Sequence, residues 1–185
     1  MELQHVNFKI FLSGEPEVDI EPIVEAFHRW TAAQSVDEML IDVADYVHVP
    51  AGPGIVLVGH EADYALDNAQ HKWGLLYNRK APVDGSNLDR FTQAFAAAIN
   101  ACARLEEEVG LTFDRQQFQL MINDRALAPN TPETLATCKH DIEAFIQSHL
   151  GQSEYTLEAE SNARRRFGVL AKLSQPFDLT VGSNS

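Results

Sequence analysis

The residues best suited to chemistry gather between positions 42 and 67. This stretch combines imidazole, carboxylate and phenol groups, and a histidine beside a carboxylate can act as a general base, because the carboxylate fixes the imidazole tautomer and raises its basicity. The candidate catalytic residues are Asp42, His48, His60 and Glu61. The candidate ligand-binding residues are Tyr46, Tyr64, Asp45 and Arg79.

Two histidines with nearby carboxylates can also hold a divalent metal, and His48 and His60 are the candidate ligands. The sequence indicates no other cofactor. The segment that starts with His60 and Glu61 lacks the second histidine of the HExxH zinc motif, and no GxSxG nucleophile motif occurs. Acid–base or metal chemistry is therefore the catalytic route open to this stretch, and the alternative is a polar sheet face in contact with water.

Strand register decides which of these side chains share a face. Asp45 interrupts an apolar face of the segment 39–49, so it is either a buried functional acid or a residue that a bulge turns toward solvent. A shift of one residue would exchange the two faces.

Two further polar groups lie outside this stretch. The run Arg164-Arg165-Arg166 can bind a carboxylate or phosphate, or it forms a solvated turn between two strands. His5, Asn7 and Lys9 share one face of the first strand, and they join a pocket only if that strand neighbours the strands around residues 42–67.

The elements that must position these residues follow from hydrophobic periodicity. Alternation of apolar and polar residues predicts strands near 6–12, 39–49, 55–66, 73–79 and 118–122, with a final hairpin of 155–160 and 167–173. Three- and four-residue spacing predicts helices that begin near residues 20, 87 and 132. This order favours an α+β fold, with a mostly antiparallel sheet, a central three-stranded meander plus flanking strands, and about three helices packed on it. We expect a single globular domain over 1–174 and a frayed tail over 175–185.

The net charge of the chain limits the classes of partner that it can bind. The 185 residues include 27 acidic side chains against 14 lysines and arginines, a formal net charge of −13. Such a field repels phosphate backbones and anionic lipid surfaces, so we expect neither nucleic acid nor a membrane as a partner. The two cysteines, Cys102 and Cys138, lie in separate helical patterns as reduced core residues, which together with the absence of a leader pattern indicates a soluble cytoplasmic protein.

The sequence therefore favours a soluble binding or interaction domain with a small-molecule ligand, a protein partner or a second copy of itself. Ala94, Ala97 and Ala101 on the long helix offer a flat surface for a homodimer, unless that surface covers the sheet. The alternative is a small acid–base or metal-dependent enzyme with a pocket of histidines and carboxylates around residues 42–67.

Overall fold

The computed structural model describes residues 1–14, 16–50 and 52–179. Within them, eight strands form one sheet in the order β2-β3-β4-β5-β1-β6-β8-β7, and every neighbouring pair is antiparallel. The strands are β1 (Val6–Leu12), β2 (Leu40–Tyr46), β3 (Gly54–Gly59), β4 (Ala62–Asp67), β5 (Gly74–Arg79), β6 (Phe113–Ile122), β7 (Tyr155–Ala159) and β8 (Phe167–Leu173).

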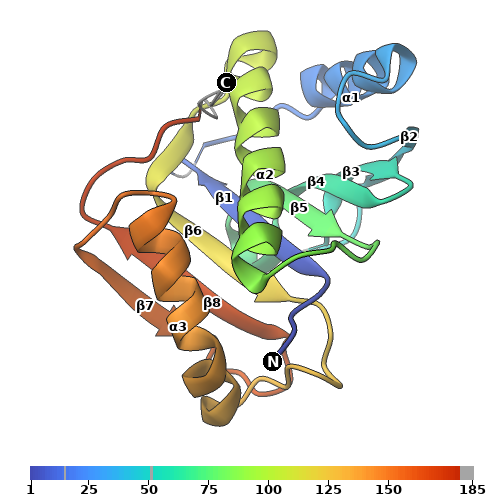
Figure 1. The fold of residues 1–185 in the computed structure, drawn as a ribbon. Coiled ribbons are helices and arrows are strands. Elements are labelled where there is room, and N and C mark those ends of the chain that lie inside the picture. Colours follow the sequence, from blue (N-terminus) through green and yellow to red (C-terminus); the bar gives the residue numbers. More distant parts are fainter. Residues whose placement is uncertain (15, 51, 180–185) are drawn as a thin grey trace, which may run out of the picture.

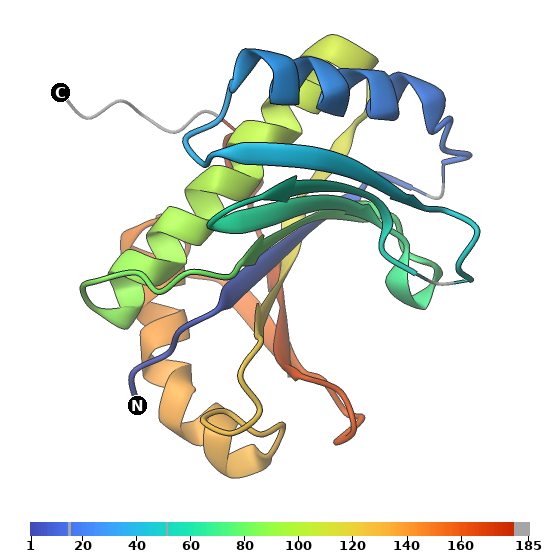
Figure 2. The same cartoon turned by 90° about the vertical axis from the view of Figure 1, so that its right-hand side faces the viewer.

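Three α-helices cover one side of this sheet, as the two views in Figures 1 and 2 show. The long helix α2 (Asn87–Val109) lies over β1 and β5, α1 (Glu21–Ala33) packs against β2 and β3, and α3 (Pro132–Ser148) packs beside α2. A short 3-10 turn, η1 (Ala69–His71), lies on the opposite side. The predicted α+β fold with a mostly antiparallel sheet and three helices is therefore confirmed.

The start and end of α2 follow from local sequence. The Ser86 side chain accepts a hydrogen bond from the backbone of Asp89, whose carboxylate accepts one from the backbone of Ser86 in return. Gly110 ends the helix with a φ of 78°, a left-handed conformation that glycine adopts without strain. These two signals determine where α2 begins and ends.

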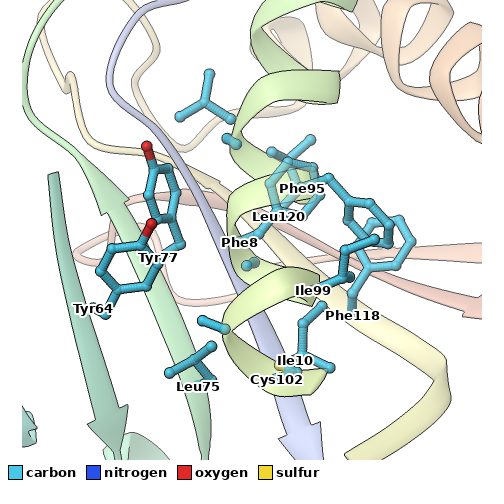
Figure 3. Packing of buried hydrophobic residues seen from close by; sticks show 14 of the residues in the cluster. Phe8, Ile10, Tyr64, Leu75, Tyr77, Phe95, Ile99, Cys102, Phe118 and Leu120 are labelled. Carbon is cyan, nitrogen blue, oxygen red and sulfur yellow. The ribbon is translucent and has the colours of Figure 1, made fainter. Parts of the chain in front are cut away.

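The core between the helices and the sheet is aromatic. Figure 3 shows Phe95, Ile99 and Cys102 of α2 lying over β1 and β6. The Phe95 ring lies 5.2 Å from that of Phe8 and 5.4 Å from that of Phe118, in edge-on arrangements that aromatic pairs favour. A core of this kind can hold the sheet in place without any polar contact.

The small residues of α2 belong to this core. Ala94 and Ala101 are buried, and Ala97 is half-buried against the same core. The three alanines therefore form no flat exposed surface for self-association. A homodimer stays a prediction that these residues do not support. Cys102 and Cys138 are buried free thiols, and burial raises the pKa of each.

The meander differs from the expected three strands. The predicted strand over 55–66 turns back at His60 and Glu61, so that it forms the hairpin of β3 and β4. A Cβ at Gly59 would lie 2.4 Å from the carbonyl oxygen of Ala62, so the turn depends on a glycine at this position. The apolar and polar alternation runs on through the turn, which is why periodicity alone does not reveal it.

The C-terminal segment packs further than expected. Phe177 and Leu179 are buried, and the backbone N–H of Phe177 donates to the carbonyl oxygen of Arg115 at 2.9 Å. The domain thus extends at least to Leu179, while the predicted frayed residues 180–185 lie outside the described residues. None of the helices in the described ranges is both long enough and apolar enough to cross a membrane.

Candidate anion-binding site

A hollow of about 370 Å³ opens on the side of the sheet that carries none of the described α-helices. Its floor is formed by β1, β5, β6 and β8, and its rim by η1 and by the segment between β7 and β8. Figure 2 shows η1 and the β7–β8 turn projecting from this side, away from the helices. We call this space the first hollow.

Strand alternation gives the first hollow a polar floor. Phe8 and Ile10 of β1 point into the aromatic core, so Lys9 between them points the other way. In the register of the sheet, Lys9 lies between Leu76 of β5 and Gln119 of β6. One charged side chain is therefore placed in the middle of the sheet, where both neighbouring strands cover its backbone.

A buried ion pair crosses the floor. The Nζ of Lys9 donates to Oδ2 of Asp67, and the two residues are only 3% and 6% exposed. The same carboxylate oxygen accepts the backbone N–H of Ala69 at 3.2 Å. Gly74 of β5 pairs in register with Asp67 and with Phe11, and a Cβ there would lie 3.0 Å from Cε of Lys9. A side chain at this position would crowd the lysine, so glycine leaves the space that the pair needs.

The ammonium group of Lys9 keeps part of its hydrogen-bonding capacity. Burial, the largest influence, lowers the pKa of Lys9, the attraction of Asp67 raises it by less, and nearby Lys72 lowers it further. An ammonium carries three donors, and among the described residues Asp67 is its one acceptor. Lys9 can therefore donate to a molecule in the first hollow.

Further basic side chains gather around the first hollow. Lys9, Lys72, Arg125, Arg165 and Arg166 line the first hollow, against Asp67 and Glu160 as its acidic residues. Five positive and two negative charges leave a local excess of three positive charges, in a chain whose net charge is −13. The formal charge of the residues that line the first hollow thus has the sign opposite to that of the whole chain.

Arg166 is held by an amide rather than by a carboxylate. In the amide orientation that satisfies its neighbours, the oxygen of the fully buried Asn7 accepts from Nη1 of Arg166 at 3.2 Å. Burial lowers the pKa of Arg166, Asp67 acts in the opposite direction, and Arg125 lowers it further. Because no carboxylate in the described ranges forms an ion pair with Arg166, its charge remains available to an anion.

The η1 segment is strained where it borders the first hollow. Gln70 and His71 have φ angles of 61° and 57°, left-handed values that non-glycine residues adopt only where the surrounding structure holds them. The Nε2 of Gln70 donates to Oε2 of Glu160 at 3.3 Å, and this carboxylate also pairs with Nη1 of Arg165 at 3.3 Å. This chain of contacts ties η1 to the β7–β8 turn at the rim.

The two histidines predicted as metal ligands lie far from this hollow and from each other. His48 follows β2, whose last residue, Tyr46, pairs with Gly54, whereas His60 follows Gly59 at the other end of β3. The six residues of β3 separate them by roughly 16 Å, at about 3.3 Å per residue. Within residues 1–14, 16–50 and 52–179, no group of three or more histidine, cysteine or acidic side chains could hold a metal ion.

The predicted catalytic carboxylates lie on the exposed β2 edge and the turn beside it. Oδ1 of Asp42 accepts the backbone N–H of Val43 at 2.8 Å, and Oε1 of Glu61 lies 3.2 Å from Nδ1 of His60. The pKa of Glu61 is lowered: desolvation, the largest single influence, opposes this shift, but hydrogen bonds from backbone N–H groups and from His60 together outweigh it. These carboxylates are used in local hydrogen bonds, and an acid–base role for them stays a prediction.

The two predicted ligand-binding residues of β2, Asp45 and Tyr46, face water. Asp45 is exposed, and its carboxylate accepts the backbone N–H of Val47 at 2.9 Å. A bulge lies near the start of the strand, between Leu40 and Asp42. Of the two alternatives for Asp45, the structure shows the solvent-facing one. Tyr46 is 44% exposed at the strand end and contributes nothing to the first hollow.

Two of the predicted ligand-binding residues do meet, on the helix-covered side and around a carboxylate that the sequence does not single out. The hydroxyl of Tyr64 donates to Oε2 of Glu38 at 2.6 Å, and that of Tyr77 donates to Oε1 at 2.7 Å. Nη1 of Arg79 lies 3.9 Å from Oε1, and Nε2 of Gln93 donates to the Tyr77 hydroxyl at 2.9 Å. Burial, followed by the negative charge of Glu38, raises the pKa of both tyrosines. We call these residues the Glu38 cluster.

The first hollow could have been found only in part from the sequence. Lys9 and Asn7 alternate with buried residues of β1, and the arginine run has the chemistry of an anion site. What the sequence lacks is the strand order, which places β1 between β5 and β6 and so brings residues 9, 67, 125 and 166 together. Comparison of the chain with protein-family models and with curated proteins finds no match.

Proposed function

We propose that this chain is a binding domain whose ligand is a small anion, held in the first hollow by Lys9 and Arg166. The single observation that carries the proposal is the local excess of three positive charges in a chain with a net charge of −13. An arrangement that gathers basic groups against the overall field favours an anionic ligand. Carboxylate and phosphate groups both fit this chemistry.

Apolar side chains support a ligand that is more than a bare ion. Phe11, Leu76, Met121 and Leu170 line the first hollow beside its charged groups. Ligand pockets commonly combine an apolar surface with a few polar groups that set the orientation. We therefore expect a small organic molecule with an apolar body and an anionic end.

The surrounding charge favours a small ligand over a polymer. Nucleic acid would bring many phosphates close to the acidic remainder of the surface, whereas a small anion meets only the basic lining of the first hollow. The two buried thiols, Cys102 and Cys138, support a reducing compartment such as the cytoplasm.

Isothermal titration calorimetry with inorganic phosphate and with butyl phosphate tests this function. The wild-type protein should bind both saturably and butyl phosphate more tightly, because its alkyl chain contacts the apolar lining. Arg166→Gln should weaken both about tenfold, the loss expected for one charge-assisted hydrogen bond of about 1.5 kcal/mol. The matched control is Lys139→Gln, which removes one exposed positive charge from α3.

Two results would contradict the proposal. One is the lack of saturable binding to either phosphate. The other is an equal loss of affinity in Lys139→Gln and Arg166→Gln, which would mean that phosphate responds to net charge and not to the first hollow.

A further inference from the structure

A second hollow of about 460 Å³ adjoins the first. Phe11 and Lys72 line both spaces, so the two hollows meet at these side chains. The strained η1 segment lies along this boundary, with Gln70 at the first hollow and His71 at the second. A molecule that is anchored in the first hollow can therefore extend past Phe11 into the second.

The second hollow has aromatic walls. Phe11 and Trp73 both line it. The edge of the Trp73 ring lies close to Gly54 of β3, since a Cβ added at that glycine would lie 3.3 Å from Cζ3 of the ring. Flat faces of this kind suit the stacking of a planar ring.

An asparagine side chain in the second hollow indicates that the ring carries a hydrogen-bond donor. Asn68 lines the space, and its Oδ1 atom is buried with no hydrogen-bond partner among the described residues. A buried acceptor calls for a donor, because leaving it unpaired is costly. An asparagine amide offers one acceptor and two donors side by side, a pattern that matches the edge of a nitrogen heterocycle such as adenine.

We propose that the ligand is a nucleoside monophosphate or a compound of the same chemistry, an anionic group joined to a planar nitrogen heterocycle. The proposal rests on the anion-binding function proposed above. The phosphate occupies the first hollow against Lys9 and Arg166, and the ring lies against Trp73. A rotation of the Asn68 side chain on binding then lets its Oδ1 atom accept an N–H of the ring. The volumes of the two hollows fall within the range of roughly 300–1,000 Å³ that is typical of small-molecule sites.

The test compares adenosine 5′-monophosphate with ribose 5-phosphate, which carries the same phosphate and sugar but no ring. By calorimetry, the nucleotide should bind roughly tenfold to a hundredfold more tightly, the range expected for stacking of one base on aromatic side chains. The nucleotide should also change the fluorescence of Trp73, whereas ribose 5-phosphate should not.

Asn68→Ala locates the ring. This variant should weaken the nucleotide about tenfold, by the loss of a buried hydrogen bond, and leave the affinity for ribose 5-phosphate unchanged. It should also fold as stably as the wild type, because the acceptor that it removes has no partner in the described chain. Asn100→Ala, on the exposed surface of α2, is the matched control and should change neither affinity.

The outcomes separate this inference from the function on which it rests. Equal affinities for the two phosphates would overturn the heterocycle assignment and leave the anion site standing. A loss of affinity for both phosphates in Asn68→Ala would overturn the placement of the ring beside Asn68. Failure of both compounds and of inorganic phosphate to bind would overturn the anion site itself.

Discussion

The molecule buries two carboxylates in two different ways. On the helix-covered side, Glu38 accepts one hydroxyl donor on each of its oxygens, at 2.7 Å from Tyr77 and 2.6 Å from Tyr64. On the opposite side, Asp67 faces the ammonium of Lys9 at the edge of an open hollow. Glu38 is 6% exposed, and so is Asp67, so burial alone does not distinguish the two regions.

The two regions differ in whether the central charged group has hydrogen-bonding capacity left over. Both oxygens of Glu38 have protein donors, and Nε2 of Gln93 donates to the Tyr77 hydroxyl, so the one buried atom of the cluster that lacks a partner among the described residues is the amide oxygen of Gln93 and not the carboxylate. The ammonium of Lys9 has one acceptor among the described residues and faces a space lined by further basic groups. A buried polar group whose partners are complete supports structure, whereas one with spare donors that faces a cavity is suited to binding.

We expect the strongest effect on stability and on binding from the removal of Lys9. Lys9→Met should lower the free energy of unfolding by about 3–5 kcal/mol, because it leaves the carboxylate of Asp67 buried without its counter-ion. The double variant Lys9→Met, Asp67→Leu should recover most of that loss and still fail to bind phosphate. Urea denaturation measures the stability and calorimetry the binding.

The control for this experiment is Lys172→Met, whose side chain is 48% exposed beside Glu158 and should cost less than about 1 kcal/mol. If the double variant bound phosphate as well as the wild type, Lys9 would have only a structural role. The contrast with the Glu38 cluster would then be lost.

A smaller loss is expected in the Glu38 cluster. Tyr64→Phe removes the donor to Oε2 of Glu38 and should lower the free energy of unfolding by about 1–3 kcal/mol, the cost of an unpartnered buried acceptor. Phosphate affinity should stay at the wild-type value, because the cluster lies on the other side of the sheet. Weaker phosphate binding in this variant, at full folding, would show that the two regions are coupled.

The stability of the Glu38 cluster should depend on pH in the alkaline range. The pKa values of Tyr64 and Tyr77 are raised in the folded state, mainly by burial, so the fold keeps protons that the unfolded chain loses above about pH 10. This stability is fully present below about pH 10 and should fall as pH rises, by about 1.4 kcal/mol per pH unit for each tyrosine.

Urea unfolding of the wild type and of Tyr77→Phe, between about pH 9 and about pH 11, isolates this effect from the titration of other groups. The variant should lose stability less steeply, by the contribution of one tyrosine. Tyr46→Phe, at an exposed position, should keep the wild-type slope. Equal slopes in all three proteins would mean that the buried hydroxyls do not retain their protons.

The sequence predicts which segments form helices and strands better than it predicts which strands lie side by side in the sheet. The aromatic stripe of α2 and the alternation in β1 are local patterns, and they identify the helix and the strand directly. The placement of Lys9 beside residue 67 depends on β5 and β1 pairing across a long stretch of chain, which no local pattern encodes. His48 and His60 lie at opposite ends of β3, because His48 is in the connection before this strand and His60 is in the turn after it.

Amide NMR chemical shifts of the wild-type protein, recorded during a phosphate titration, show directly where the anion binds. We expect saturable shifts at residues of the first hollow, including Lys9, Gln119 and Arg166, and none at Glu38 or Tyr64. Shifts at the Glu38 cluster, or shifts around His48 and His60 without any in the first hollow, would contradict this expectation.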